Sequence, residues 1–238
     1  MSPSPLFVVS PHLDDAVFSC GMLLAMHPGS IVCTVFAGAP RPALSTPWDQ
    51  ASGFADSDAA SEARRREDDR ALALLDARPI RLAFTDSQYR QSPAIETVSA
   101  ALDEAWQRSG HLAFVAPIGL YHSDHILVAD ACCALLDSAK VAPLIAYEEA
   151  IYRHIGRIAL ERRGSLASRG ILTTPDTDEI LMPVRSARAA AQKWRSVRAY
   201  RSQLRALGDA HPNDLVEPER YWRLSLARSV YRRADHSR

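Results

Sequence analysis

The feature that most constrains the fold is an apolar segment followed by a polar turn and then an apolar helix. Residues 6–9 are apolar at every position, as in a strand that is buried on both faces. The turn that follows, residues 10–15, reads SPHLDD, and residues 16–26 continue as an apolar helix. A strand buried on both faces is typical of a parallel sheet, and such sheets bind ligands at the carboxyl ends of their strands. The turn therefore predicts a functional site.

The rest of the chain alternates strand and helix patterns. We expect further strands at residues 31–36, 80–84, 112–116 and 144–147, a late strand at 179–184, and helices at 58–75, 95–108, 126–136 and 187–207. This alternation predicts a doubly wound, Rossmann-like α/β fold with a mostly parallel sheet and helices on both faces. We expect one domain over residues 1–238, with a core at 6–152 and a C-terminal extension of strand and helix at 153–238.

Composition excludes several classes of partner. The chain has 238 residues and 47% hydrophobic content, as in an ordinary globular domain, and its 28 basic residues equal its 28 acidic ones. The chain therefore has no net positive charge that would attract nucleic acid or an anionic membrane. No apolar run is long enough to span a bilayer. The four cysteines include an adjacent pair at 132–133, and no positively charged leader precedes the first strand. We expect a cytoplasmic protein with reduced thiols; no pattern addresses its oligomeric state.

A second polar cluster follows the strand expected at 112–116. It contains His122, Asp124 and His125 and precedes the helix expected at 126–136. Two strand-to-helix turns at the same edge of a sheet can form a single crevice. Together with the first turn they offer His12, Asp15 and His125, and two imidazoles plus one carboxylate are the ligand set of a catalytic zinc that keeps a position for water. The metal site is therefore predicted at the carboxyl ends of the strands.

Two polar groups, Asp14 and His122, remain beside the predicted metal, where acid/base chemistry would need them. An alternative role for the first turn is a helix N-cap, in which one Asp accepts backbone N–H bonds. That role explains one Asp, but it explains neither the second Asp nor His12.

The two clusters resemble signatures of the PIG-L or LmbE-like deacetylases, zinc-dependent enzymes that remove N-acetyl groups from amino sugars. The first is similar to the Pro-His-Pro-Asp-Asp-Glu signature and the second to His-x-Asp-His. The chain departs from the first signature at Leu13, where the family often has Pro, and at Ala16, where it often has Glu. Neither position is a predicted ligand.

The resemblance implies a role for each site residue. His12, Asp15 and His125 would bind Zn²⁺, or another divalent metal such as Fe²⁺. Asp14 would be the general base, His122 would polarise the carbonyl or stabilise the oxyanion, and Asp124 would orient His122. Arg64 matches the arginine of a family helix and is the candidate substrate contact.

The resulting hypothesis is a metal-dependent hydrolase that removes an N-acetyl group from an N-acetylglucosamine-type substrate by means of a metal-activated water. A rival within the same chemistry is an amidase that acts on a non-acetyl sugar-thiol conjugate. Outside the enzymes, the alternative is a non-catalytic sugar- or nucleotide-binding module. A nucleotide-binding module of this fold needs glycines in its first turn for close approach to phosphate. The first turn of this chain has no glycine, and its two carboxylates would repel phosphate.

Three other segments have open roles. Residues 37–57 form a long connection beside the predicted site, and they are either a substrate lid or a surface loop that packs Trp48 against the sheet. The run 63–70 is typical of a solvated helix face with Glu/Arg pairs. The arginines between 153 and 169 either contact a phosphate-bearing substrate or form a charged surface.

Overall fold

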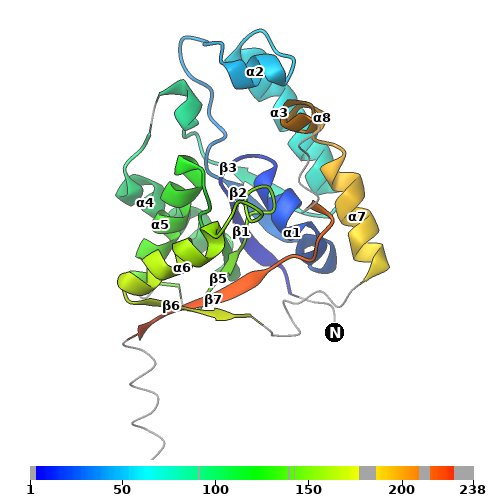
Figure 1. Cartoon of the computed structure of the whole chain (residues 1–238). Coiled ribbons are helices and arrows are strands. Elements are labelled where there is room, and N and C mark those ends of the chain that lie inside the picture. Colours follow the sequence, from blue (N-terminus) through cyan, green and yellow to red (C-terminus); the bar gives the residue numbers. More distant parts are fainter. Residues whose placement is uncertain are drawn as a thin grey trace, which may run out of the picture.

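A single mixed sheet organises the computed structural model, which describes residues 4–90, 92–138, 140–141, 143–176, 186–208 and 215–227. Within these ranges the strand order is β3-β2-β1-β4-β5-β7-β6 (Figure 1). The strands are β1 (Leu6–Ser10), β2 (Ile31–Thr34), β3 (Arg78–Arg81), β4 (Ala113–Pro117), β5 (Leu144–Tyr147), β6 (Ile171–Pro175) and β7 (Tyr221–Leu226). β1 to β5 are parallel, and β7 is antiparallel to both β5 and β6. The prediction of a mostly parallel α/β sheet is confirmed.

Helices cover both faces of the sheet because the side chains of its central strands alternate between two apolar clusters. In β1, Phe7 and Val9 pack with α4, α5 and α6, whereas Leu6 and Val8 pack with α1, α3 and α7. The helices of the first group are α4 (Ile95–Arg108), α5 (Ser123–Asp137) and α6 (Ile158–Ser168), and those of the second are α1 (Asp15–Met26), α3 (Ser57–Ala73) and α7 (Ala187–Val197). No helix in the described ranges is long and apolar enough to cross a membrane.

The strand order places a crevice between β1 and β4. From β1 the chain adds β2 and β3 on one side, and it then returns to place β4 and β5 on the other side. Such a reversal of direction opens a crevice at the carboxyl ends of the two central strands. Both polar clusters of the sequence follow these two strands, so they meet there.

Two predicted helices differ from the structure. α5 begins at Ser123, so Asp124 and His125 lie in its first turn and not in the preceding loop. The single helix expected at 187–207 is two helices, α7 and α8 (Arg201–Leu207). The break falls at Tyr200, which is buried and donates its hydroxyl to Asp68 Oδ1 at 2.8 Å. The strand expected at 179–184 lies outside the described residues.

The acidic residues of α3 also differ from the expected solvated face. Glu67 is buried and accepts hydrogen bonds from the backbone N and the hydroxyl of Ser202, at 3.0 and 2.6 Å. Asp68 is fully buried and bonds Arg81 as well as Tyr200. Glu67 satisfies a backbone N–H that the first turn of α8 leaves unbonded, and Asp68 holds the side chain of Tyr200 just before that turn, so both carboxylates attach the start of α8 to α3. They thereby fix α8 above the carboxyl ends of the strands.

Candidate metal centre and active site

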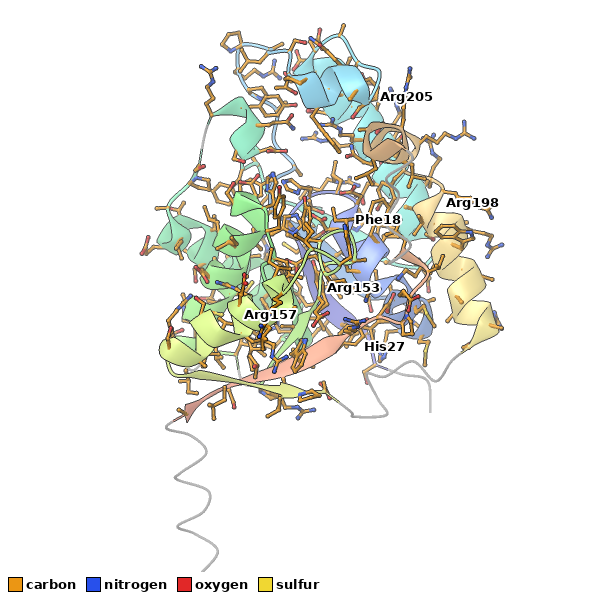
Figure 2. The ribbon with its side chains drawn as sticks, in the orientation of Figure 1. Phe18, His27, Arg153, Arg157, Arg198 and Arg205 are labelled. Atoms are coloured by element: carbon orange, nitrogen blue, oxygen red, sulfur yellow. The ribbon has the colours of Figure 1, made fainter. Side chains whose placement is uncertain are left out.

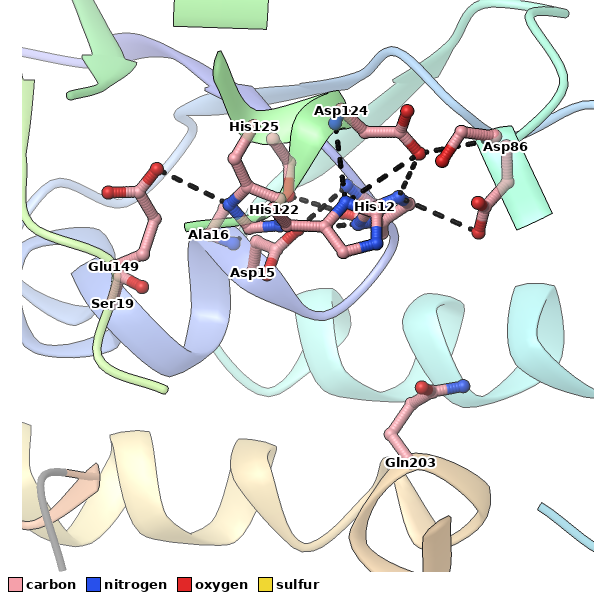
Figure 3. A network of polar contacts seen from close by, with 12 residues as sticks. His12, Asp15, Ala16, Ser19, Asp86, His122, Asp124, His125, Glu149 and Gln203 are labelled. Atoms are coloured by element: carbon pink, nitrogen blue, oxygen red, sulfur yellow. Dashed lines mark hydrogen bonds and ion pairs between the residues drawn. The ribbon is translucent and has the colours of Figure 1, made fainter. Parts of the chain in front are cut away.

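The three predicted metal ligands meet where β1 and β4 end (Figure 3). Asp15 Oδ2 lies 3.2 Å from His12 Nδ1 and 3.2 Å from His125 Nε2. In a tetrahedral zinc site with bonds of about 2.0–2.2 Å, neighbouring ligand atoms are roughly 3.3–3.6 Å apart. The observed spacing is therefore close to that of ligands around one ion.

The ring nitrogen Nε2 of His125 gives an independent test of whether a metal fits. The side chain is fully buried, and Nε2 has no hydrogen-bond partner among the described residues. Its 3.2 Å contact with Asp15 Oδ2 is an ion pair without hydrogen-bond geometry, and a cation between the three ligands would give this nitrogen a direct partner. Two imidazoles with one carboxylate suit Zn²⁺ or Fe²⁺. The residues therefore fit a divalent metal.

Charge within the cluster already compensates the buried carboxylate. Burial raises the pKa of Asp15, but His125 and His12 outweigh it and hold this pKa well below its usual range. Burial lowers the pKa of His125, while Asp15 and Glu149 raise it to about 9. Protonated imidazole thus carries the positive charge beside Asp15 in the metal-free protein. A bound metal would take over that role and release protons.

Asp14 lies next to this cluster and lines a cavity of about 250 Å³. It occupies the N-cap position of α1, but its side chain makes no capping hydrogen bond. Burial and the neighbouring charge of Asp15 raise its pKa to about 7. A carboxyl group with this pKa is suited to accept and return a proton near neutral pH, and the capping alternative does not describe it.

His122 is the N-cap residue of α5, and its ring lines the same cavity. Nδ1 accepts a hydrogen bond from the backbone N of Asp124 at 3.3 Å. Burial and the positive charge of His12 lower the pKa of His122. The neutral ring therefore carries its proton on Nε2, from which it can donate.

The carboxylate of Asp124 is placed differently from the predicted contact with His122. Its Oδ2 is 3.9 Å from His122 Nδ1, whereas it lies 3.1 Å from His12 Nε2 and accepts the backbone N–H of Ser87 at 3.1 Å. Only the backbone of Asp124 bonds His122. The carboxylate thus orients His12 and keeps Nε2 of that ring as a donor, so that Nδ1, on the side of Asp15, is the nitrogen that a metal would take.

The connection at 37–57 forms part of the wall of the cavity. It contains α2 (Pro47–Ala51), whose Trp48 lines the cavity and belongs to neither apolar cluster that packs on the sheet. The indole Nε1 donates to Gln203 Oε1 of α8 at 3.2 Å. Gln203 and Leu207 line the same cavity. α2 and α8 thus both line the cavity, and a role of this connection as a substrate lid stays a prediction.

Arg64 lines the cavity, but its guanidinium is already engaged. It pairs with the buried Asp49 at 3.0 Å and donates to the hydroxyl of Ser52 at 3.2 Å. Tyr89 donates its hydroxyl to the same carboxylate at 3.0 Å. Arg64 and Tyr89 therefore anchor α2 to α3 and to the loop after β3. A substrate contact by Arg64 stays a prediction.

Two charged residues of the site lie in segments that resemble the family in the sequence, but neither residue was assigned a role there. Asp86 follows β3 and places Oδ2 3.6 Å from His12 Nε2, and Glu149 follows β5 and places Oε1 3.3 Å from His125 Nδ1. Both stand after a strand, in the same relation as the two recognised clusters. Both residues could have been predicted from the sequence, because polar residues directly after the strands of a parallel sheet are candidates for its binding site.

Four of the five arginines between 153 and 169 contact other residues of the chain. Arg162 and Arg169 both pair with Asp130 at 2.7 Å, and Arg163 stacks 3.9 Å over the ring of Trp222. Arg153 is buried and donates to Pro218 O at 2.8 Å, whereas Arg157 is exposed (Figure 2). Most of this stretch therefore binds its own chain and not an anionic substrate.

Comparison with known proteins identifies the family of the chain. The family model described as PIG-L: GlcNAc-PI de-N-acetylase matches residues 7–136, which contain all seven predicted site residues. The chain belongs to the PIG-L family, as the two motifs predict. No curated protein matches the sequence.

Solved structures share the fold along almost the whole chain. A deacetylase triple mutant (Orf2*T) of the teicoplanin biosynthetic pathway superposes with a TM-score of 0.74 at 23% identity, covering 94% of this chain and 98% of its own. The N,N'-diacetylchitobiose deacetylase from Pyrococcus horikoshii gives 0.58 at 15% identity, with 96% and 86% coverage. GalB, the 4-carboxy-2-hydroxymuconate hydratase from Pseudomonas putida KT2440, gives 0.55 at 17% identity, with 93% and 95% coverage. The fold therefore hosts more than one reaction, and the site must specify which one.

Proposed function

We propose that the protein is a metal-dependent hydrolase that removes the N-acetyl group from an amino sugar. The main support is that Asp14 lies beside three potential ligand atoms, which come from the ends of two strands. One of these atoms is Nε2 of His125, which makes no hydrogen bond with the described residues. Metal ligands adjacent to a carboxyl group with a pKa near 7 form a site for hydrolysis by an activated water. Family membership supports the same reaction.

The first step needs a water and a base. A bound Zn²⁺ or Fe²⁺ supplies Lewis acidity and, in the case of zinc, can lower the pKa of a water to about 7. Asp14 accepts the proton of this water as its oxygen attacks the acetyl carbonyl carbon. The same carboxyl group then returns the proton to the amine nitrogen as the C–N bond breaks. Acetate and the free amino sugar are the products.

His122 stabilises the charge that develops on the carbonyl oxygen. Its neutral ring holds the proton on Nε2 because Nδ1 accepts the backbone N–H of Asp124. A donor fixed in advance toward a developing oxyanion contributes roughly 10²–10³-fold in rate. In this scheme the carboxylate of Asp124 acts through His12, which it holds by Nε2 at 3.1 Å.

The size and lining of the cavity support an amino sugar as substrate. Its volume of about 250 Å³ lies below the roughly 300–1,000 Å³ of pockets for drug-sized ligands, so it holds one sugar ring with its acetamido group. Trp48 and Tyr152 provide aromatic surface, while Gln88 and Gln203 provide hydrogen-bonding groups. The remainder of a larger substrate would extend past α2 and α8.

Metal identity and compartment belong to the same proposal. A teicoplanin deacetylase of this fold has been described in a zinc-inhibited form, so the activating metal must be tested and not assumed. The four cysteines are free and buried, which supports a reducing compartment such as the cytoplasm.

The test is acetate release by protein reconstituted separately with Zn²⁺, Fe²⁺ and Co²⁺. Substrates are N-acetylglucosamine, its nucleotide, its inositol-linked form and its aromatic and lipid glycosides. We expect acetate and a free amine in equal amounts from at least one of them, and none from EDTA-treated protein. Hydrolysis of a sugar-thiol conjugate without acetate release would favour the amidase alternative. Metal binding with no hydrolysis of any of these compounds would overturn the proposal.

A further inference from the structure

Glu149 is a buried carboxylate that is neither a proposed metal ligand nor a proposed catalytic residue. It follows β5, its exposed fraction is 0%, and it lies on the side of His125 that faces away from Asp15 (Figure 3). Its neighbour Glu148 points elsewhere and accepts the indole N–H of Trp222 at 2.8 Å. The two glutamates are therefore adjacent in sequence but have separate surroundings.

One carboxylate oxygen of Glu149, Oε1, faces three nitrogen donors. Oε1 accepts the backbone N–H of Gly119 at 2.9 Å and that of Leu120 at 3.0 Å, and it lies 3.3 Å from His125 Nδ1. Gly119 has a φ of 89°, a conformation that disfavours other residues, and a Cβ there would lie 2.7 Å from the Cβ of Ala129. The backbone thus fixes the carboxylate before the imidazole is considered.

This arrangement determines which nitrogen of His125 is available. Oε1 accepts two backbone N–H groups and therefore faces His125 as an acceptor, which places a proton on Nδ1. Nε2 is then the nitrogen that a metal would take, since it faces Asp15 Oδ2 at 3.2 Å and makes no hydrogen bond with the described residues. Carboxylates that accept the second N–H of a metal-binding histidine fix its tautomer and raise its basicity.

We propose that Glu149 is a positioning residue that holds His125 in the metal-binding tautomer and joins it to the loop that carries His122. The proposal rests on the proposed metal-dependent function. It predicts that Glu149 contributes to metal affinity without touching the substrate. Loss of such a partner typically weakens metal binding ~10–100-fold.

The first experiment measures the Kd for Zn²⁺ by competition with a chromophoric chelator. Glu149→Ala should raise the Kd ~10–100-fold. Glu149→Gln should raise it less, because the amide oxygen still accepts the three N–H groups. Glu148→Gln is the matched control, a change of the same size at the adjacent buried glutamate, and should leave the Kd unchanged. Equal Kd values for the wild type and a folded Glu149→Gln and Glu149→Ala would overturn the proposal.

The second experiment needs no variant and therefore stands even if Glu149→Ala fails to fold. In zinc-loaded wild-type protein with ¹⁵N-labelled histidine, NMR should show a proton on Nδ1 of His125 and none on Nε2. A proton on Nε2 would overturn the inference while leaving the hydrolase proposal intact. A wild-type protein that binds no divalent metal would overturn the proposed function itself.

Discussion

Asp14 and Asp15 are adjacent in the chain, and yet the pKa values of their carboxyl groups shift in opposite directions. Burial and the charge of Asp15 raise the pKa of Asp14 to about 7, whereas His125 and His12 hold that of Asp15 far below its usual range. Asp15 faces the two imidazoles, and Asp14 lines the cavity. Two carboxyl groups with separated pKa values are suited to different roles, one as a ligand and one as a base.

Substitution should separate these two roles. Asp14→Asn should retain the metal and lower kcat by ~10²-fold or more, the usual cost of losing a general base. Asp15→Asn should lower metal occupancy, and activity should fall as a consequence, since an amide cannot replace the charge of the ligand. Elemental analysis and acetate release on the same samples test both. Full occupancy in Asp15→Asn, His12→Ala and His125→Ala would contradict the ligand assignment.

The pH profile should report Asp14. A general base acts only when deprotonated, so kcat/KM should rise with pH until Asp14 has lost its proton. The pKa of about 7 belongs to the metal-free protein, and a cation beside the carboxylate stabilises its charged form. The acidic limb of the metal-loaded enzyme should therefore have its midpoint below pH 7. The residual activity of Asp14→Asn should lack this limb, and an unchanged limb would assign the base elsewhere.

His122 should affect turnover without affecting metal binding. Replacement by Ala removes the Nε2 donor and should lower kcat roughly 10²–10³-fold. The metal content should stay at the wild-type level, because His12, Asp15 and His125 remain. Tyr152, which stacks on the His122 ring with centroids 6.4 Å apart, provides a control. Tyr152→Phe retains the stack and should have little effect, whereas loss of metal in His122→Ala would assign it as a ligand.

The contact between α2 and α8 should select for larger substrates. Trp48→Ala removes an aromatic wall of the cavity and the hydrogen bond to Gln203. We expect kcat/KM for an aromatic glycoside to fall by ~10-fold, equivalent to about 1.4 kcal/mol, and that for free N-acetylglucosamine to fall less. Gln203→Leu removes only the acceptor and separates the hydrogen bond from the stacking surface. Equal losses on both substrates would exclude a role for this contact in selectivity.

A buried ion pair should contribute to stability. Lys193 Nζ on α7 lies 2.9 Å from Glu219 Oε1, and both side chains are buried. Glu219 also accepts the backbone N–H groups of Met22 and Leu23, just after the non-helical Cys20 in α1. Lys193→Met should leave this carboxylate without a cation and lower the free energy of unfolding by ~3–5 kcal/mol. Urea denaturation measures the change.

The double variant Lys193→Met with Glu219→Gln is the control for that prediction. It removes the buried charge and keeps an acceptor oxygen for the backbone of α1. It should recover part of the lost stability, since a buried unpaired charge costs more than a neutral amide. A double variant less stable than Lys193→Met would show that the charge of Glu219 is favourable without its partner.

The sequence determined the sheet and the identity of the proposed site residues. Local patterns sufficed, because a buried parallel strand is apolar along its length and its carboxyl end is where polar residues gather. His12 and Asp15 after β1, and His125 after β4, therefore had to approach one another once both strands lay side by side. The edge strand β6 and its neighbour β7 were missed, since both are only partly buried and therefore lack a continuous apolar run.

The tertiary structure decided the partner of each polar side chain. Asp124 is close to both His122 and His12 in the fold, and only the path of the backbone determines that its carboxylate bonds His12. Gln203 became part of the cavity because Glu67 of α3, remote in sequence, fixes the start of α8. A hydrogen bond depends on a few tenths of an ångström and on direction, and these are set by the packing of segments that are remote in the chain. Local periodicity does not contain that information.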